Sequence, residues 1–468
     1  MKHTPLSLIA HWAGGELHGD DVMIDAVSND TRTLATGSLY VALRGERFDG
    51  HDFASDALMR GASGLLVERL LPEIELPQVL VADAESALAR VAAGMQRGRG
   101  TRVFAITGSN GKTSVKALLL SILQQVQELD GQRVYATPGN RNNEIGLPLA
   151  VIAAPDDADF AVYEMGAGKP GDIAYLTEIA RPDFALVNNI APAHLERMGS
   201  LLGVAQTKGA IYAALPGDGV AVINADDAFG AWFEQAIVQP GSTGRQVIRF
   251  GLQASADVRA QAIAATPQGS NFTLVTPQGD AAVTLHLPGR HNIRNALAAA
   301  ALALGAGISP DRIAEGLAQA RPVAGRQIAH VLPGGAVLID DSYNANPGSL
   351  DAAIDALAGP GEGWLVLGDM RELGPEGAAL HAAAGRRARE AKLARLYALG
   401  DLSAHAAQAF GERGRVFASH AELAAALQAD INNAATPLRV LVKGSRGSAM
   451  DKIVTALLAH GEEAPNAA

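Results

Sequence analysis

Cysteine is absent from the 468 residues of this chain. Without thiols the protein cannot form disulfides, use a cysteine nucleophile or hold zinc through thiolates. Aromatic residues make up only 4% of the chain, whereas glycine occurs 51 times. This composition favours close packing of helices on sheets over an aromatic-rich binding surface.

Positive charge is also scarce, since the formal net charge is −11 at pH 7. Proteins that bind nucleic acid generally, or anionic membrane surfaces, need a basic face. We therefore expect no nucleic-acid partner. An anionic substrate would have to meet locally placed cations or the N-termini of helices.

Long hydrophobic runs are missing as well. The longest apolar run, residues 296–308, is rich in alanine and shorter than the roughly 20 residues that span a bilayer. The first 15 residues contain His11 and Trp12 and do not have the pattern of a signal peptide. We expect a cytoplasmic protein with no membrane insertion.

The length indicates several domains, because single cores rarely exceed about 250–300 residues. Three regions differ in pattern. Residues 1–100 mix helical stretches with short β-like runs at 38–43, 64–67 and 79–81. We expect this region, residues 101–320 and residues 321–468 to form separate domains.

The middle region repeats the order strand, glycine turn, helix. Apolar runs at 103–106, 160–163 and 184–187 predict buried strands of a parallel sheet with crossover helices. Between residues 247 and 287 the pattern predicts an antiparallel appendage, and residues 291–304 are strongly helical.

The last region contains further strand–helix units. Their predicted strands are residues 336–339, 364–367 and 439–442, with 396–399 as a candidate fourth. The sequence therefore predicts an α/β protein with three domains: a small N-terminal α/β domain, a central P-loop-type parallel sheet with helices on both faces, and a C-terminal Rossmann-like domain.

A glycine-rich turn lies between a buried strand and an amphipathic helix; it consists of Thr107, Gly108, Ser109, Asn110, Gly111, Lys112 and Thr113. Such a turn brings backbone N–H groups and a helix N-terminus to a triphosphate. Lys112 would reach the β and γ phosphates, and the Thr113 hydroxyl would ligate Mg²⁺. The first glycine is Gly108, so the loop is a compact variant of the usual P-loop. An ordinary strand-to-helix connector is the alternative.

Polar side chains follow the next two strands at the same edge of the expected sheet. Glu164 ends one strand, and His194 follows the other. With Thr113 they would surround one magnesium ion, for which carboxylate and hydroxyl oxygens are suitable. Histidine is an unusual ligand of Mg²⁺, so spacing alone favours His194 as a loop residue. Lys208, by itself, reads as a solvated surface charge.

An ordered set of motifs resembles the Mur ligases. The motifs are TGSNGKT at 107–113, GNRNNEIG at 139–146, YEMG at 163–166, NIAPAHLE at 189–196, GRHNIRNA at 289–296 and AGR at 324–326. DDSYNANP at 340–347, GDMRELG at 368–374, DTR at 30–32 and residues 42–49 resemble the branch of the family that adds a dipeptide. The resemblance covers nearly the whole chain.

The resemblance implies roles for individual residues. Residues 107–113 would bind the ATP phosphates, with Asn292, Asn295, Arg326 and Asp341 lining the rest of the nucleotide. Thr113 and Glu164 would hold magnesium, with His194 at a second ion and Lys208 carbamylated as an anionic ligand. The substrate residues would be Ser28, Thr31 and Arg32 for uridine, Asn142 and Asn143 for the muramoyl-peptide arm, and Tyr343, Asn344 and Asn346 for the dipeptide.

The implied activity is an ATP- and Mg²⁺-dependent ligase. It would join D-alanyl-D-alanine to UDP-N-acetylmuramoyl-tripeptide through an acyl phosphate, in peptidoglycan precursor synthesis. Residues 1–100 would bind the UDP-sugar, 101–320 the ATP and 321–468 the acceptor, and the protein would act as a monomer on small molecules. Two alternatives remain: a related ligase that adds a single amino acid to a muramoyl-peptide or glutamate to a folate, and a non-catalytic nucleotide switch.

Overall fold

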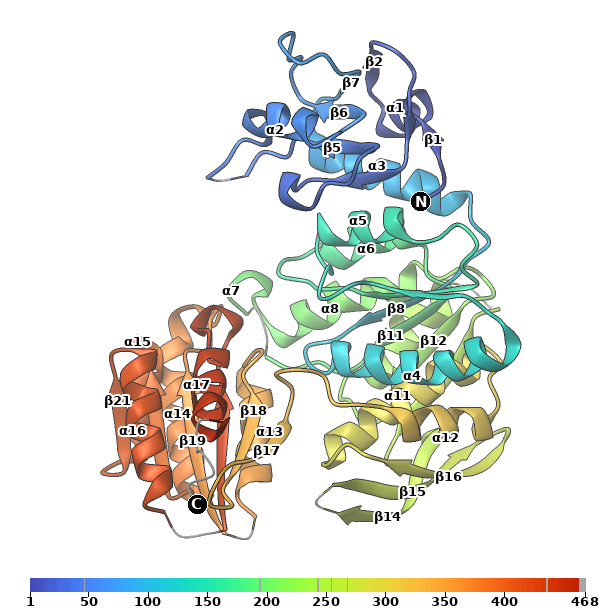
Figure 1. Cartoon of the computed structure of the whole chain (residues 1–468). Helices are drawn as coiled ribbons and strands as arrows, with labels where there is room; N and C mark the ends of the chain where they lie inside the picture. Colours follow the sequence, from blue (N-terminus) through green and yellow to red (C-terminus); the bar gives the residue numbers. More distant parts are fainter. Residues whose placement is uncertain are drawn as a thin grey trace. The chain divides into compact units, whose positions relative to one another are not determined.

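The computed structural model describes residues 1–45, 47–192, 195–241, 244–253, 255–266, 268–359, 361–434 and 437–462 (Figure 1). The chain divides into two compact units. The first unit contains Met1–Asn189 and Ala205–Ala320, and the second contains Ile190–Val204 and Arg321–Ala468. The predicted boundaries between three domains, after residues 100 and 320, stay a prediction.

The N-terminal part of the first unit is a small α/β layer. Its sheet has the order β2-β7-β6-β5-β4, in which β2 is antiparallel to its neighbour and the others are parallel. The strands are β2 (Glu16–His18), β4 (Ala26–Ser28), β5 (Ser38–Val41), β6 (Gly64–Val67) and β7 (Gln78–Leu80). The helices are α1 (Leu6–Ala13), α2 (Ala54–Met59) and α3 (Ala84–Arg97), and β1 (Thr4–Pro5) pairs with β3 (Met23–Ile24).

A second sheet of the first unit carries nine strands among the described residues, in the order β16-β15-β14-β13-β12-β11-β8-β10-β9. The strands are β8 (Arg102–Thr107), β9 (Val134–Ala136), β10 (Phe160–Glu164), β11 (Phe184–Val187), β12 (Val220–Asn224), β13 (Gln246–Gly251), β14 (Val258–Thr266), β15 (Gly269–Thr276) and β16 (Gly279–Leu285). The strands β8 to β13 all pair in parallel. The loops that follow β8, β10 and β11 therefore meet at one edge of the sheet.

The predicted antiparallel appendage at residues 247–287 is wrong in two respects. β13 pairs in parallel with β12, and only β14, β15 and β16 form an antiparallel meander. Moreover, β13 joins β14, so that the meander extends the central sheet. The turn residues between these short strands are the same in both arrangements, so the sequence pattern could not separate them.

Helices cover both faces of the nine-stranded sheet. Figure 1 shows α4 (Lys112–Asp130), α11 (Arg290–Gly305) and α12 (Pro310–Gln319) on one face and α5 (Gly146–Ala153) and α6 (Asp172–Ala180) on the other. The amphipathic helix predicted after the glycine turn is confirmed as α4, in which Val115, Leu118, Leu119 and Ile122 are all buried. α8 (Leu201–Ala213), α9 (Gly230–Phe233) and α10 (Gln239–Gly241) complete this region.

Small residues set the spacing between these helices. Six alanines of α11 are buried side by side: Ala296, Ala298, Ala299, Ala300, Ala301 and Ala303. In α12, a Cβ atom on Gly316 would lie 2.4 Å from the Cα atom of Ile122 in α4. Helices packed through hydrogen atoms and methyl groups approach closely, so α4, α11 and α12 form a tight layer beneath the sheet.

In the second unit, the described residues form a six-stranded sheet in the order β17-β18-β22-β19-β20-β21. Its strands are β17 (Ile328–Val331), β18 (Val337–Asp341), β19 (Glu362–Gly368), β20 (Arg395–Leu399), β21 (Gly414–Phe417) and β22 (Leu438–Lys443). β17 is antiparallel and the others are parallel, so the loops after β18, β22 and β19 lie side by side. The predicted strand at 396–399 is confirmed as β20.

Alternating side chains of this sheet enter two cores. Leu365 and Leu367 of β19 pack with α13 (Pro347–Leu357), α14 (Gly377–Glu390) and α15 (Asp401–Phe410). Trp364 and Val366 face α16 (His420–Asn432) and α17 (Asp451–Glu462) on the other side. The short helix α7 (Leu195–Met198) also belongs to this unit. The predicted fold class, α/β with a doubly wound C-terminal sheet, is confirmed.

Within the described part of the chain, no helix is both long enough and apolar enough to cross a membrane.

Candidate active site

The turn from β8 into α4 requires glycine for two reasons. Gly111 has a φ angle of 79°, in the left-handed region that favours glycine. A Cβ atom at this position would lie 2.5 Å from Nδ2 of Asn188 and 2.7 Å from Oδ1 of Asn295. Even alanine would therefore strain the backbone and displace two amides.

Asparagine side chains hold this turn in shape. The backbone N–H groups of Ser109 and Asn110 donate to the carbonyl and the side-chain oxygen of Asn189, each at 2.9 Å. The amides of Asn188 and Asn189 donate to the Asn110 carbonyl at 3.0 and 3.1 Å. Asn188 also donates to Oδ1 of Asn295 at 3.1 Å. The predicted nucleotide residue Asn295 thus supports the turn from α11.

Lys112 and Thr113 begin α4 at the edge of the turn. The Lys112 ammonium donates to the Gly108 carbonyl at 2.8 Å. The Thr113 hydroxyl donates to Oε2 of Glu164 at 2.9 Å. Glu164 ends β10 and is only 2% exposed. The structure therefore brings together the hydroxyl and the carboxylate that the sequence predicts as magnesium ligands.

A lysine that sequence reasoning overlooked lies beside this pair. Lys116 is 6% exposed, and its ammonium is 3.8 Å from Oε2 of Glu164. It donates to the carbonyls of Thr137 at 3.2 Å and Gly139 at 2.8 Å. The signal was present in the sequence, because residues four apart share a helix face and Lys116 follows Lys112 by one turn.

Lys208 is buried rather than solvated. Its side chain on α8 is 1% exposed, and no residue in the described ranges accepts a hydrogen bond from its ammonium. Burial lowers the pKa of Lys208 to about 7; Lys112 adds to this lowering and Asp172 opposes it. The reading of Lys208 as a surface charge is wrong, because its side chain is buried and its lowered pKa makes the neutral amine accessible near pH 7.

The donor atoms at this edge fit a magnesium ion. The Thr113 hydroxyl and the Glu164 carboxylate are hard oxygen ligands, and a carbamate on Lys208 would add another. No three His, Cys, Asp or Glu side chains gather as a metal site within the described ranges. His194, the other predicted ligand, lies outside the described residues.

Asn142 and Asn143 differ in what their side chains contact. The Asn142 amide donates to Oε1 of Glu164 at 2.9 Å, so Asn142 belongs to the same cluster. The side-chain oxygen of Asn143 accepts from the Gly146 N–H at 2.9 Å and supports the start of α5. Asn292, at the start of α11, donates to the Pro288 carbonyl at 2.8 Å. Their ligand-binding roles stay predictions.

The predicted uridine residues form a separate group at the end of β4. Ser28 donates to the Asp30 carbonyl at 3.1 Å, and Thr31 and Arg32 lie in the short 3-10 helix that follows. The guanidinium of Arg32 donates to both Asp30 oxygens and, as the largest contribution, lowers the pKa of Asp30 to about 2. Arg32 remains exposed, which is compatible with a ligand contact.

The predicted residues of the second unit gather where β18 and β22 end. Asp341 accepts from the Lys443 ammonium at 2.6 Å, and Lys443 also donates to the Asn344 carbonyl at 3.1 Å. The Arg326 guanidinium lies 4.4 Å from the centre of the Tyr343 ring. Because Asp341 already has a buried cationic partner, its primary contact in this unit is with Lys443.

Asn346 has a structural role in the same loop. It caps α13, since its side chain accepts from the Ser349 N–H at 2.9 Å while the Ser349 hydroxyl accepts from the Asn346 N–H at 3.1 Å. The predicted contact of Asn346 with a dipeptide stays untested.

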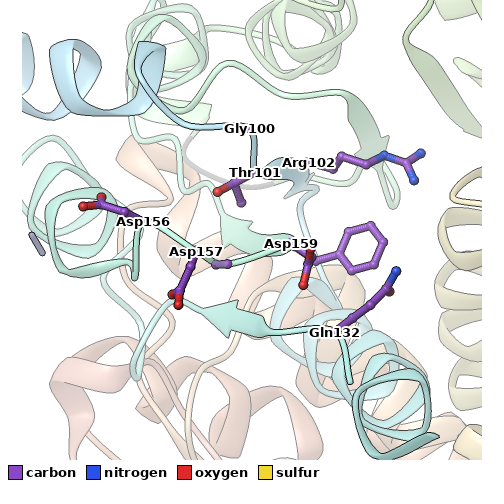
Figure 2. A pocket seen from close by; sticks show the side chains of 9 residues that line it. Gly100, Thr101, Arg102, Gln132, Asp156, Asp157 and Asp159 are labelled. Atoms are coloured by element: carbon purple, nitrogen blue, oxygen red, sulfur yellow. The ribbon is translucent and has the colours of Figure 1, made fainter. Parts of the chain in front are cut away.

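A hollow of about 320 Å³ lies at the opposite edge of the nine-stranded sheet, where β8 and β10 begin (Figure 2). Three aspartates surround it in Figure 2: Asp156, Asp157 and Asp159. Each is engaged, since Asp156 pairs with Arg99, Asp157 with Arg133, and Asp159 accepts from the Arg133 N–H. The hollow is separate from the glycine turn at residues 107–113, and its lining includes none of the predicted site residues.

Family profiles match the chain over most of its length. The Mur ligase family catalytic domain matches residues 23–96, the Mur ligase middle domain matches residues 106–303, and the Mur ligase glutamate ligase domain matches residues 325–446.

Known proteins resemble the whole chain. The UDP-N-acetylmuramoyl-tripeptide--D-alanyl-D-alanine ligase of Escherichia coli K12 is 45% identical over 464 residues, covering 98% of this chain and all of that protein. The crystal structure of MurF from Acinetobacter baumannii, 33% identical, superimposes with a TM-score of 0.89 over 98% of this chain and all of that one.

A second solved structure contains a nucleotide. MurF from Thermotoga maritima in complex with ADP is 26% identical, with a TM-score of 0.81 over 94% of this chain and 98% of that one. The profiles, the full-length identity and the shared fold agree with the motifs around the glycine turn at residues 107–113. This chain belongs to the Mur ligase family.

Proposed function

We propose that this protein is an ATP-dependent ligase that joins D-alanyl-D-alanine to UDP-N-acetylmuramoyl-tripeptide in peptidoglycan precursor synthesis. One observation carries the proposal: the turn at residues 108–111 places Lys112 and Thr113 beside the buried carboxylate of Glu164. This arrangement suits phosphoryl transfer, and the full-length relatives with this named activity support the choice of substrates.

The reaction has two chemical steps. An oxygen of the tripeptide carboxylate attacks the γ-phosphorus of ATP, which gives an acyl phosphate and ADP. The amine of D-alanyl-D-alanine then attacks the acyl carbon, phosphate leaves, and the amine loses a proton. Since the first step brings two anions together, the chain must hold positive charge in place beforehand. Lys112 supplies this charge at the phosphates, and the turn positions the nucleotide.

Magnesium would be held by Thr113 and Glu164, and a carbamate on Lys208 would be a further ligand. When bound, the ion neutralises phosphate charge and orients the transferred group. The chain's own residues fix the ligands: Asn142 and Thr113 hold the two Glu164 oxygens, and Lys116 holds the loop after β9 against them. His194 is proposed as a ligand of a second ion on the family resemblance alone.

In this proposal each of the three predicted regions binds a different substrate. Residues 1–100 bind the UDP-sugar through Ser28, Thr31 and Arg32, and residues 101–320 bind ATP. Residues 321–468 bind the acceptor through the Tyr343–Asn346 loop and supply Arg326 and Asp341 to the nucleotide. Since one chain carries all these residues, we propose that it acts as a monomer in the cytoplasm, where ATP is available.

Phosphate release by the purified protein tests the proposal. With ATP, Mg²⁺ and UDP-N-acetylmuramoyl-tripeptide, we expect sustained release only after D-alanyl-D-alanine is added, with a pentapeptide product in the mass spectrum. Lys112→Ala should lower turnover by at least 100-fold without unfolding the protein. Faster turnover with a single amino acid would favour another ligase of the family, and absence of any amide product would favour the nucleotide switch.

A further inference from the structure

Three loops at the edge of the second unit are tied together by one hydroxyl group. Ser445, which follows β22, is 6% exposed. Its hydroxyl accepts from the backbone N–H of Arg371 at 2.9 Å and donates to the Ala345 carbonyl at 3.3 Å. The loops after β19, β22 and β18 therefore meet at Ser445, at the edge where open α/β sheets bind ligands.

Arg371 extends from the first of these loops and is held at several points. A buried histidine, His381, accepts from the Met370 N–H at 2.9 Å and fixes the backbone before Arg371. The guanidinium lies against Gly447, where an added Cβ atom would be 2.8 Å from both Cζ and Nη1 of Arg371. The backbone before Arg371 and its guanidinium group are thus both positioned, although the side chain is exposed.

The other cations of this edge are already engaged. Lys443 donates to Asp341 and to the Asn344 carbonyl. Arg446 pairs with Asp451 at 3.3 Å and lies 5.7 Å from the centre of the Tyr343 ring. Arg326 lies over the same ring. Arg371, in contrast, has no carboxylate partner among the residues that the structure describes.

We propose that Arg371 binds the free carboxylate of the D-alanyl-D-alanine acceptor and so selects a dipeptide with an ionised C-terminus. The inference rests on the proposed function. The acceptor's amine must reach the acyl phosphate, so its carboxylate points away from the reacting atoms and needs a cation of its own. A guanidinium binds a carboxylate through two parallel N–H donors, which also fixes the direction of the dipeptide.

The expected effect is specific to one substrate. Arg371→Ala should raise the KM for D-alanyl-D-alanine by roughly 10- to 100-fold, as expected for a lost charge-assisted hydrogen bond, and leave the KM values for ATP and UDP-N-acetylmuramoyl-tripeptide within about twofold. Arg371→Lys should give an intermediate value, since it keeps the charge and loses the paired donors. Arg389→Ala, which removes an exposed arginine from the last turn of α14, is the control.

Gly447 provides a second, independent variant. Gly447→Ala keeps Arg371 in the sequence but places a methyl group where the guanidinium lies. Since the atoms in the way are the far end of a flexible side chain, the fold should survive while Arg371 moves. The KM for the dipeptide should rise in Gly447→Ala, and combining it with Arg371→Ala should add little.

The decisive experiment compares D-alanyl-D-alanine with its C-terminal amide as acceptors. Wild type should prefer the acid strongly, and Arg371→Ala should use acid and amide with similar kcat/KM. If wild type forms no product with D-alanyl-D-alanine, the proposed function fails. If wild type forms product but Arg371→Ala retains its preference for the acid, or shows a raised KM for ATP instead, the assignment of Arg371 is overturned.

Discussion

Replacing Lys116 by methionine tests whether the buried ammonium stabilises the buried carboxylate of Glu164. Methionine has a similar length and fills the space, so the change removes charge and donors rather than volume. The variant leaves the carbonyls of Thr137 and Gly139 without their ammonium donor. It also leaves Glu164, 2% exposed, without the cation 3.8 Å from its Oε2 atom.

Both partners of this pair are buried, and this burial sets the expected loss of stability. Removing one partner of a buried ion pair costs about 3–5 kcal/mol, most of it from the remaining charge. The distance of 3.8 Å is too long for a direct hydrogen bond, so the two carbonyl contacts contribute a large share. We expect the thermal transition of the first unit to fall by roughly 5–15 °C.

The assay is thermal unfolding with and without Mg²⁺ and ADP. Since a bound cation would compensate Glu164, the ligands should stabilise Lys116→Met more than wild type. Lys2→Met, which removes an exposed lysine from the same unit, is the control and should change the transition by less than about 2 °C. A loss below about 1 kcal/mol in Lys116→Met, or equal stabilisation of both proteins by the ligands, would refute the reasoning.

Three further predictions concern the same region. Because the pKa of Lys208 is lowered to about 7 by burial, the neutral amine that reacts with carbon dioxide increases from pH 6 to pH 8.5. The carbamate signal in ¹³C NMR with labelled bicarbonate should increase in parallel and be absent in Lys208→Met. The unfolded chain binds the extra proton between pH 7 and about 10.5, so burying Lys208 costs most below pH 7 and least near pH 10. Lys208→Met should therefore stabilise the protein by a few kcal/mol more at pH 6 than at pH 9 in urea unfolding, and a pH-independent difference would contradict the buried, uncharged amine. Gly111→Ala should raise the KM for ATP at least 10-fold, because its Cβ atom meets Asn188 and Asn295 as well as straining the backbone. The control is Gly131→Ala, because Gly131 has a φ of 72° and no atom lies within 4 Å of the added Cβ. This variant should lose only about 1–2 kcal/mol of stability and keep its KM for ATP. Equal KM values for ATP in both variants would remove the steric argument.

Local pattern predicted the strands that are both apolar and central. Residues 103–106, 160–163 and 184–187 became β8, β10 and β11, because a strand covered on both faces must be continuously apolar. β9 was missed, since its three residues are only partly buried. β12 was missed although Val220–Asn224 is fully buried. Because an antiparallel appendage was expected from residue 247, the predicted parallel sheet ended before β12 and β13.

The candidate site was predictable only where chemistry and local spacing coincide. The glycine turn with Lys112 and Thr113 could be read directly, and the meeting of Thr113 with Glu164 followed from the rule for strand ends. The burial of Lys208 could not, because a lysine in an amphipathic pattern gives no sign of what packs over it. The proposed role of Arg371 could not be read from the sequence either, because its contact with Gly447 spans 76 positions.

The alanine-rich packing of α11 has a consequence for nucleotide binding. The short methyl side chains of its six buried alanines cannot change rotamer to accommodate a shift of the helix. Rotating α11 by one residue, about 100°, would turn Asn295 away from Asn188 and Gly111. The hydrophobic core around α11 therefore fixes the position of the amide that supports the glycine turn, and enlarging a buried alanine such as Ala299 should alter ATP binding.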